Sequence, residues 1–271
     1  MHYVVSDVHG HVDDLVAALR RAGLLDADLA WGGASARLTF MGDYFDRGPD
    51  GIAVVDLVRR LQREAGAAGG RVDALIGNHE ILALGMSRFG AQHVPSGSWN
   101  RRSFARSWAL NGGQLHDQQG LTDEHIRWLS SLDSVLRAGD DLLLHSDTTE
   151  YLRWGDTAEQ INESVRKVLA GDDLQAWWQC WVRLTTRYAF AGLEGEQVAT
   201  ELLAVFGGQR IVHGHSVIST FTGQLPGEVT GPLSYAGGRV LAVDGGIYAG
   251  GPCLVVRLDP ESVPGASAAP A

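Results

Sequence analysis

The sequence predicts an α/β fold in which helices pack on β-sheet, built as a single domain of a 271-residue chain. In the first third, short apolar runs rich in β-branched residues alternate three times with longer helical patterns. In the last third, strand-like runs follow one another, and no internal repeat or linker divides the chain. A hydrophobic content of 45% is enough for a sizeable core.

Strand and helix patterns come in a βαβαβα order at the start of the chain. The expected strands span 2–6, 37–42 and 71–77, and the expected helices span 12–23, 52–66 and 80–90. Further strand-like runs lie at 141–147, 209–216, 238–246 and 252–259. Helical cap insertions are expected around 89–133 and 148–208, so that one domain covers 1–258. The tail, 259–271, is expected to be disordered.

Charge and cysteine content narrow the class of protein. With 22 basic and 32 acidic residues, the net charge of −10 argues against nucleic acid or an anionic membrane as a partner. Cys180 and Cys253 are too few for a disulfide framework, which favours a reducing compartment. No signal peptide pattern and no apolar run of about 18 residues is present, so we expect a cytoplasmic protein.

Five polar clusters follow expected strands directly. They are SDVHG (6–10), GDYFDRG (42–48), GNHE (77–80), HSD (145–147) and HGHS (213–216). Each alone can be a strand-end cap, a turn, a helix N-cap or a hydrogen-bonded core histidine. Together they predict a shared partner, because unpaired buried carboxylates and imidazoles are costly. Mixed Asp, His and Asn ligands suit two divalent transition ions, with Mn²⁺ favoured and Fe or Zn²⁺ as alternatives.

The order and spacing of D-x-H-G, G-D-x-x-D-R-G and G-N-H-E, followed by two later histidines, resemble the bacterial phosphoprotein phosphatases among the calcineurin-like metallophosphoesterases. The resemblance covers about residues 1–258. It implies a four-layer α/β/β/α sandwich of two mixed sheets flanked by helices. Ser6 replaces a common glycine, and HSD replaces the HGG of eukaryotic members. Ser6 is small enough to be tolerated, whereas HSD argues against a dedicated phosphoprotein substrate, so a small phosphorylated molecule is favoured.

The resemblance also implies a set of metal ligands. Asp7 and His9 would bind the first ion, Asp43 would bridge both, and Asn78, His145 and His215 would bind the second. His213, which precedes the glycine of HGHS, is expected to be structural or to support a ligand.

Catalytic roles are implied in the same way. Arg47 and Asn78 would bind the phosphate, and His79 would protonate the leaving-group oxygen while Asp46 holds its tautomer. A second phosphate-binding arginine is usual in the family. Between Arg183 and Arg187, the tryptophan two residues before Arg183 favours Arg183.

The function expected from this resemblance is that of a phosphoric monoester hydrolase of the serine/threonine phosphatase type, acting by direct attack of a metal-bridging hydroxide. An alternative is a hydrolase of nucleotides or dinucleoside polyphosphates, but relatives of that kind tend to lack the aspartate of DRG and to carry GNHD. Asp46 and Glu80 therefore favour the phosphatase. A catalytically inactive protein that binds a phosphorylated ligand is less favoured, because every expected metal ligand is present.

The segment 88–113 carries four arginines on an acidic chain: Arg88, Arg101, Arg102 and Arg106. Because it follows the GNHE helix, it is expected to leave the sheet beside the metal site. One interpretation is a cap whose arginines, with Trp99 or Trp108, contact the substrate beyond the phosphate. The other is a solvated loop with its tryptophans packed inside. The natural substrate and the oligomeric state do not follow from the sequence.

Overall fold

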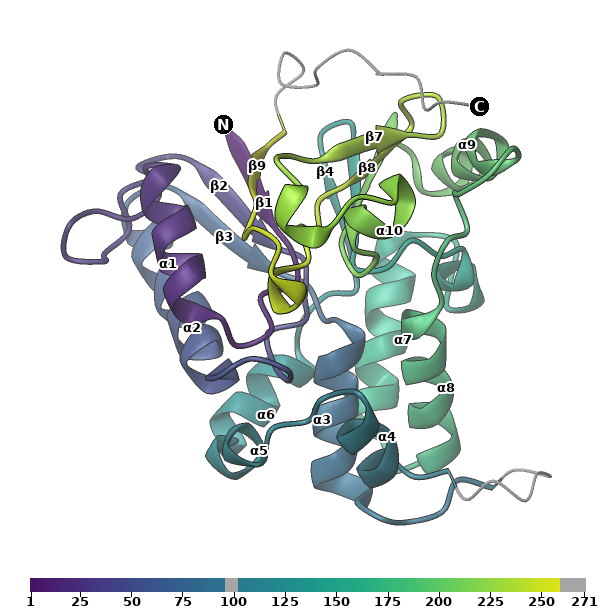
Figure 1. Ribbon diagram of the computed structural model, residues 1–271. Helices are drawn as coiled ribbons and strands as arrows, with labels where there is room; N and C mark the ends of the chain where they lie inside the picture. The colour runs from purple at the N-terminus through teal and green to yellow at the C-terminus, as the bar shows by residue number, and fades with distance from the viewer. Residues whose placement is uncertain (96–101, 259–271) are drawn as a thin grey trace.

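The structure is a computed structural model that describes residues 1–95 and 102–258. Two mixed β-sheets pack face to face, with helices on their outer faces and a group of helices beyond one end (Figure 1). This is the α/β fold of two mixed sheets flanked by helices that the sequence predicts. The expected disordered tail, residues 259–271, lies outside the described residues.

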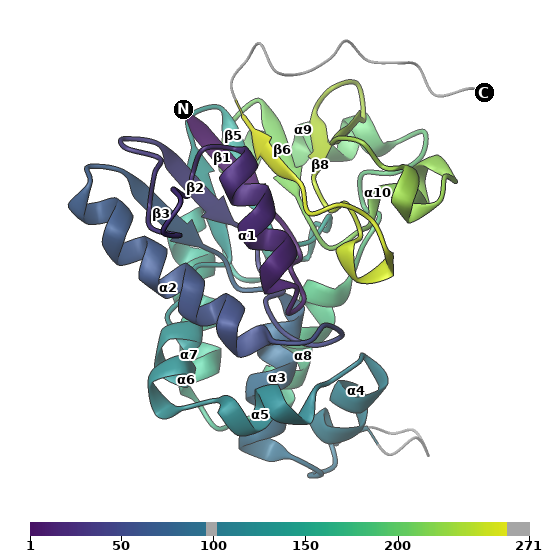
Figure 2. The ribbon, with the colours of Figure 1, turned by 60° about the vertical axis from the view of Figure 1, so that its left-hand side comes forward.

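The first sheet has the strand order β3-β2-β1-β9. Its strands are β1 (His2–Val5), β2 (Arg37–Phe40), β3 (Arg71–Ala74) and β9 (Val255–Arg257). The first three are parallel to one another, and β9 runs antiparallel to β1. Helices α1 (Val12–Arg21) and α2 (Gly51–Ala67) cover one face of this sheet, as Figure 2 shows. The predicted βαβαβ order is therefore present, with each boundary within a few residues.

The second sheet has the order β4-β5-β6-β8-β7. Its strands are β4 (Val135–Ala138), β5 (Asp141–Leu144), β6 (Arg210–His213), β7 (Leu233–Tyr235) and β8 (Val240–Ala242). Strands β5, β6 and β8 are parallel, while β4 and β7 form antiparallel edges. The sequence indicated β5, β6 and β8 but not the edge strands β4 and β7, whose residues are mostly not buried and form no continuous apolar run.

A dry layer of apolar side chains joins the two sheets. Val4 and Val256 contribute from the first sheet, and Leu143, Val212 and Leu241 from the second. Because side chains alternate across a strand, Val5 points to the opposite face, where it packs with the helices. The carboxyl ends of the parallel strands of both sheets are thereby held at a common edge.

The remaining helices lie beyond that edge or flank the second sheet. They are α3 (Asn78–Phe89), α4 (Phe104–Leu110), α5 (Leu115–Gly120), α6 (Asp123–Ser130), α7 (Ala158–Ala170), α8 (Leu174–Thr185), α9 (Gly195–Phe206) and α10 (Ile218–Thr222). Trp177 and Trp178 of α8 are buried, and Trp178 packs edge to face on Phe104 with ring centroids 5.4 Å apart. In the described part of the chain, no helix combines the length and the apolar character that a bilayer span needs.

Candidate metal centre and phosphate site

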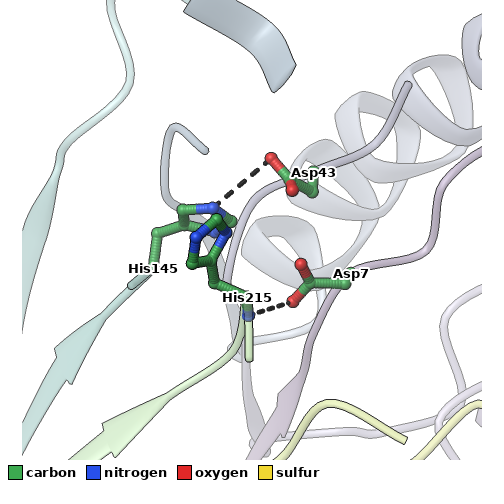
Figure 3. A group of neighbouring side chains, drawn as sticks. All are labelled: Asp7, Asp43, His145 and His215. Carbon is green, nitrogen blue, oxygen red and sulfur yellow. Dashed lines mark hydrogen bonds and ion pairs between the residues drawn. The ribbon is translucent and has the colours of Figure 1, made fainter. Parts of the chain in front are cut away.

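Four ligand side chains meet where the two sheets face each other. Asp7 follows β1 and Asp43 follows β2, whereas His145 follows β5 and His215 follows β6 (Figure 3). One potential ligand atom from each of the four lies within 4.8 Å of the others, and all four residues are buried. The two aspartates come from one sheet and the two histidines from the other, so neither sheet alone would form this cluster.

Asp43 also belongs to a second group of buried ligands, with His9 and His79. Its Oδ2 lies 3.7 Å from His9 Nε2, and its Oδ1 lies 3.4 Å from His145 Nε2. The two oxygens of one carboxylate therefore face two sets of nitrogen ligands. The grouping differs from the sequence expectation in one respect: Asp7 lies with Asp43, His145 and His215, whereas the second group pairs His9 with His79.

Backbone carbonyls orient two of the imidazoles. Nδ1 of His9 donates to the Phe45 carbonyl oxygen at 2.7 Å, and Nδ1 of His145 donates to that of Met41 at 2.9 Å. Each ring then presents an unprotonated Nε2 to the site, which is the usual way in which a protein holds a metal-binding histidine. Nε2 of His145 lies 2.9 Å from Oδ1 of Asn78. Lone pairs of an imidazole, an amide and a carboxylate thus converge, as a cation requires.

His215 is oriented through its other nitrogen. Its Nε2 lies 3.1 Å from the carbonyl oxygen of Thr185, and its backbone N–H donates to Asp7 Oδ2 at 2.8 Å. A proton on Nε2, accepted by this carbonyl, leaves Nδ1 to bind a metal. Arg187 Nη2 lies 2.9 Å from the same Nε2 and donates to it only when Nε2 carries no proton. His213 makes contacts of a different kind: Nδ1 contacts the Gly214 carbonyl oxygen at 2.8 Å and Nε2 the Tyr235 hydroxyl at 2.7 Å. Both of its nitrogens are used, in keeping with a structural role.

The loops that carry the site adopt unusual backbone conformations. His9, Asp43, Asp46, Arg47 and His215 all have positive φ, from 45° to 67°. Left-handed conformations are unfavourable for residues other than glycine and persist where surrounding contacts impose them. Positive φ at the ligand positions turns their side chains sharply away from the strand direction and into the shared edge.

Glu80 supplies much of that constraint. It is fully buried and accepts three backbone hydrogen bonds, from Asp43 N at 2.8 Å, Tyr44 N at 2.7 Å and Gly77 N at 2.8 Å. The loop after β2 is thereby joined to the start of α3. In the sequence Glu80 served only to separate two classes of enzyme, and nothing in the pattern indicated this structural role.

The charge of the site fits bound cations. Burial, reinforced by the Asp7 carboxylate, raises the pKa of Asp43 well above its usual range. Asp244, which follows β8, is affected in the same way, and its Oδ2 has no hydrogen-bond partner among the described residues. Burial lowers the pKa of His9 and His215, so both rings are neutral. Neutral imidazoles and crowded buried carboxylates are what divalent ions bind and what they stabilise.

A chain of polar contacts lies beside the ligands. Nδ1 of His79 donates to Asp46 Oδ2 at 2.7 Å, and Nη2 of Arg47 donates to His79 Nε2 at 3.1 Å. Both members of the histidine–aspartate pair are 1% exposed, and burial raises the pKa of Asp46 to about 7. The Arg47 guanidinium also lies over the Tyr248 ring, 4.0 Å from its centroid. Arg47 is thus held beside the metal ligands with His79 as its neighbour.

The two candidates for the second phosphate-binding arginine make different contacts in the structure. Arg183 Nε lies 3.6 Å from Glu150 Oε2, and its guanidinium lies over Trp154. Arg187, which follows the end of α8, has its Nη2 2.9 Å from His215 Nε2. The placement therefore favours Arg187 over Arg183, because only Arg187 is in contact with a residue of the metal cluster.

The described part of the segment after α3 packs against the helices and the histidine–aspartate pair. Trp108 is 5% exposed, and its indole N–H donates to Asp46 Oδ1 at 3.0 Å. Arg102 and Arg106 line a hollow of about 350 Å³ against α8, together with Trp178 and Trp181. The Arg88 guanidinium lies near the rings of Phe89 and Trp177. Trp99 and Arg101 lie outside the described residues.

A two-sheet fold with clustered carboxylate and imidazole ligands at its edge, beside a histidine–aspartate pair and an arginine, defines a metal-dependent phosphoesterase. The model of the calcineurin-like phosphoesterase family matches residues 3–219, and the chain belongs to this family. It is an enzyme family of metallophosphoesterases, so the recognition made from the sequence motifs is confirmed.

Individual relatives add detail. The chain is 25% identical to a cold-active protein-tyrosine phosphatase of a psychrophilic Shewanella species, with 94% of this chain and 73% of that one covered and a TM-score of 0.69. It is 36% identical over 80 residues to Shewanella-like protein phosphatase 2 of Arabidopsis thaliana and to Shewanella-like protein phosphatase 1 of Plasmodium berghei. Those matches span 30% of this chain but only 20% and 22% of the two relatives.

Proposed function

We propose that this chain is a phosphomonoesterase that works with two divalent metal ions. The observation that carries the proposal is the position of Asp43, whose two carboxylate oxygens face two separate groups of buried ligands, with Arg47 and His79 alongside. Six residues would hold the ions: Asp7, His9, Asp43, Asn78, His145 and His215. When bound, the ions supply a hydroxide near neutral pH and neutralise phosphate charge.

The residues around the ions have separable roles. Arg47 contacts His79, and Arg187 contacts His215. Each arginine offers a guanidinium fork to phosphate oxygens. Asn78 would add a hydrogen bond to the same phosphate. Forked contacts of this kind orient the ester and stabilise the charge that develops on its oxygens.

His79 is placed to act as the general acid. Asp46 accepts a hydrogen bond from Nδ1. The other nitrogen, Nε2, then faces the position beside Arg47 where a leaving oxygen would lie. Protonation of that oxygen at Nε2 lets the alcohol depart, and the Asp46 carboxylate stabilises the imidazolium that gives up the proton. Arg47 must turn from Nε2 toward the phosphate for this step.

The contact between Asp46 and His79 favours a phosphomonoesterase over a dinucleoside polyphosphate hydrolase. A monoester leaves as an alkoxide or phenoxide, which needs a proton more than a polyphosphate leaving group does. The names of the relatives support a phosphatase. Within that class, we propose a small anionic phosphoester as the substrate rather than a phosphoprotein, and Mn²⁺ as the favoured ion, with Fe or Zn²⁺ as alternatives.

The proposal is tested with protein stripped of metal and reloaded with Mn²⁺, Fe²⁺, Zn²⁺ or Mg²⁺. Rates are measured for nitrophenyl phosphate, sugar phosphates, phosphoserine and phosphotyrosine peptides, and a dinucleoside polyphosphate. Activity that needs two ions per chain and is confined to monoesters supports the proposal. Preference for the dinucleotide, or full activity after metal removal, contradicts it.

A further inference from the structure

Asp147 is a fully buried carboxylate at the centre of three loops. It lies two residues after His145, at the carboxyl end of β5. Its Oδ2 accepts a hydrogen bond from Tyr188 N at 2.8 Å, and its Oδ1 accepts one from the Ser216 hydroxyl at 2.6 Å. Its own carbonyl oxygen accepts from Ala189 N at 2.9 Å. One side chain therefore links the loop after β5 to the segment after α8 and to the loop after β6.

Both side-chain donors follow a residue of the site directly. Tyr188 follows Arg187, and Ser216 follows His215. Arg187 and His215 are themselves in contact, with Nη2 and Nε2 2.9 Å apart. The two oxygens of Asp147 thus hold the residues that follow Arg187 and His215, and so constrain the distance between the guanidinium and the imidazole.

The backbone at these positions needs such support. Tyr188 has a φ of 68° and His215 one of 64°, in the left-handed region. Non-glycine residues stay there only where neighbouring contacts impose it. Tyr188 is 42% exposed, and its ring packs edge to face on Phe221 with the centroids 5.5 Å apart.

Asp147 holds the two segments with a carboxylate rather than with a neutral amide. Across the described residues, Asp147 forms no ion pair within 4 Å, and each of its carboxylate oxygens accepts one hydrogen bond, from Tyr188 N and from the Ser216 hydroxyl. Hydrogen bonds to a carboxylate are shorter and stronger than those to a neutral amide, which suits a group that must hold two loops at one spacing.

We propose that Asp147 is a positioning residue that keeps Arg187 in register with His215, and hence the phosphate-binding guanidinium in register with the metal site. The inference rests on the proposed function, in which Arg187 binds phosphate and His215 binds metal. It also assigns a role to the last residue of the HSD sequence. Asp147 holds the segment after α8 and the loop after β6, which carry Arg187 and His215.

Two equilibrium constants test the inference without turnover. They are the dissociation constant of Mn²⁺, measured by titration of metal-stripped protein, and that of inorganic phosphate, measured by calorimetry on Mn²⁺-saturated protein. Residues that support metal ligands change metal affinity by about 10- to 100-fold when removed. Asp147→Ala is therefore expected to weaken the binding of Mn²⁺ and the binding of phosphate, each by about tenfold or more.

Two milder variants separate the arms. Ser216→Ala removes only the hydrogen bond from the residue after His215 to Asp147. The affinity for Mn²⁺ should therefore fall, while the affinity for phosphate at saturating Mn²⁺ should stay within about twofold. Asp147→Asn keeps one acceptor for Tyr188 N and offers an amide N–H to the Ser216 oxygen, so it should restore most of what Asp147→Ala loses.

Asp141→Asn is the matched control. Asp141 lies at the other end of β5, is buried, and pairs with Arg210 at 2.7 Å, so its loss lowers stability without touching the site. If the Asp147 variants match this control in both constants and differ only in melting temperature, Asp147 is merely structural and the inference is overturned. If Asp147→Ala does not fold, Ser216→Ala and Asp147→Asn decide. A wild type that binds Mn²⁺ and phosphate but hydrolyses no monoester would refute the proposed function alone.

Discussion

The indole N–H of Trp108 donates to Oδ1 of Asp46 at 3.0 Å, while Oδ2 of the same carboxylate accepts from His79 at 2.7 Å. Trp108 belongs to α4, 62 residues further along the chain than Asp46. The segment expected to cap the substrate thus contributes a buried donor that orients the acid's partner. Trp108 therefore contacts the aspartate of the histidine–aspartate pair.

Loss of this donor should slow catalysis without loss of metal. Trp108→Phe keeps an aromatic ring in the core but leaves Asp46 Oδ1 without its bond, which for a charged acceptor costs about 1.5–3 kcal/mol. If Asp46 and His79 are disordered as a result, kcat for an alkyl phosphate should fall about tenfold or more. The control is Trp177→Phe, which removes an indole bond to the Gly171 carbonyl, away from the dyad. Equal loss in both variants would mean that Trp108 acts through packing alone.

Asp43→Asn should leave fewer than two ions bound and abolish turnover, because one carboxylate serves both ligand groups. Metal content of the purified protein and the rate with nitrophenyl phosphate are the measurements. Asp73→Asn, at a carboxylate that pairs with Arg37 on β2, is the control for a general charge effect. Retention of two ions and of activity in Asp43→Asn would refute the bridging role.

His79→Asn and Asp46→Asn should reduce kcat by about 100- to 10,000-fold for an alkyl phosphate and much less for nitrophenyl phosphate. A good leaving group needs little protonation. The double variant should be no worse than His79→Asn, because the two residues act as one unit. A defect of the same size with both leaving groups would exclude His79 as the general acid.

Arg187→Ala should lower kcat/KM about 100-fold or more, whereas Arg183→Ala should stay within about twofold. The first removes a guanidinium in contact with His215, and the second removes a partly exposed ion pair with Glu150. Inhibition by inorganic phosphate provides a second measurement, since only Arg187→Ala should weaken it. The opposite ranking would restore the expectation made from the sequence.

Metal-stripped protein should become less stable as the pH rises from about 6.5 to 9. Burial raises the pKa of Asp46 to about 7 and that of Glu80 to about 8, both above their unfolded values. A folded acid with a raised pKa holds more protons than the unfolded chain, so its stabilising contribution is lost as pH rises through the folded pKa. Below pH 6.5 the buried neutral histidines act in the opposite sense, because the unfolded chain binds their protons.

Thermal melts in a chelator between pH 6.5 and 9 would measure this fall. Glu80→Gln should flatten the slope even though it lowers stability throughout. Saturating Mn²⁺ should raise the melting temperature most at high pH, where its ligands are deprotonated. A metal-free protein whose melting temperature rises over the same range would contradict the assignment of these raised pKa values.

The sequence alone determined where the ligands are. Each cluster follows an apolar run directly, and parallel strands end at the same edge, so a local pattern was enough to place Asp7 and Asp43 together. Packing of the second sheet on the first brings His145 to them. The two mixed sheets, the three leading strand–helix units and the family followed from the same motifs. Edge strands such as Leu233–Tyr235 did not, because their partly exposed residues form no continuous apolar run.

Tertiary structure decided which side chains support those ligands. Arg183 and Arg187 are four residues apart, and only the end of α8 between them, at Thr185, turns one toward Glu150 and the other toward His215. Trp108 reaches Asp46, and Asp147 joins Tyr188 to Ser216, through contacts between segments that are 41 or more residues apart. Such contacts depend on how helices pack against two sheets, and packing of that range leaves no periodic trace in the chain. Strand ends are local features of a sequence, whereas the partners of a buried carboxylate are set by the whole fold.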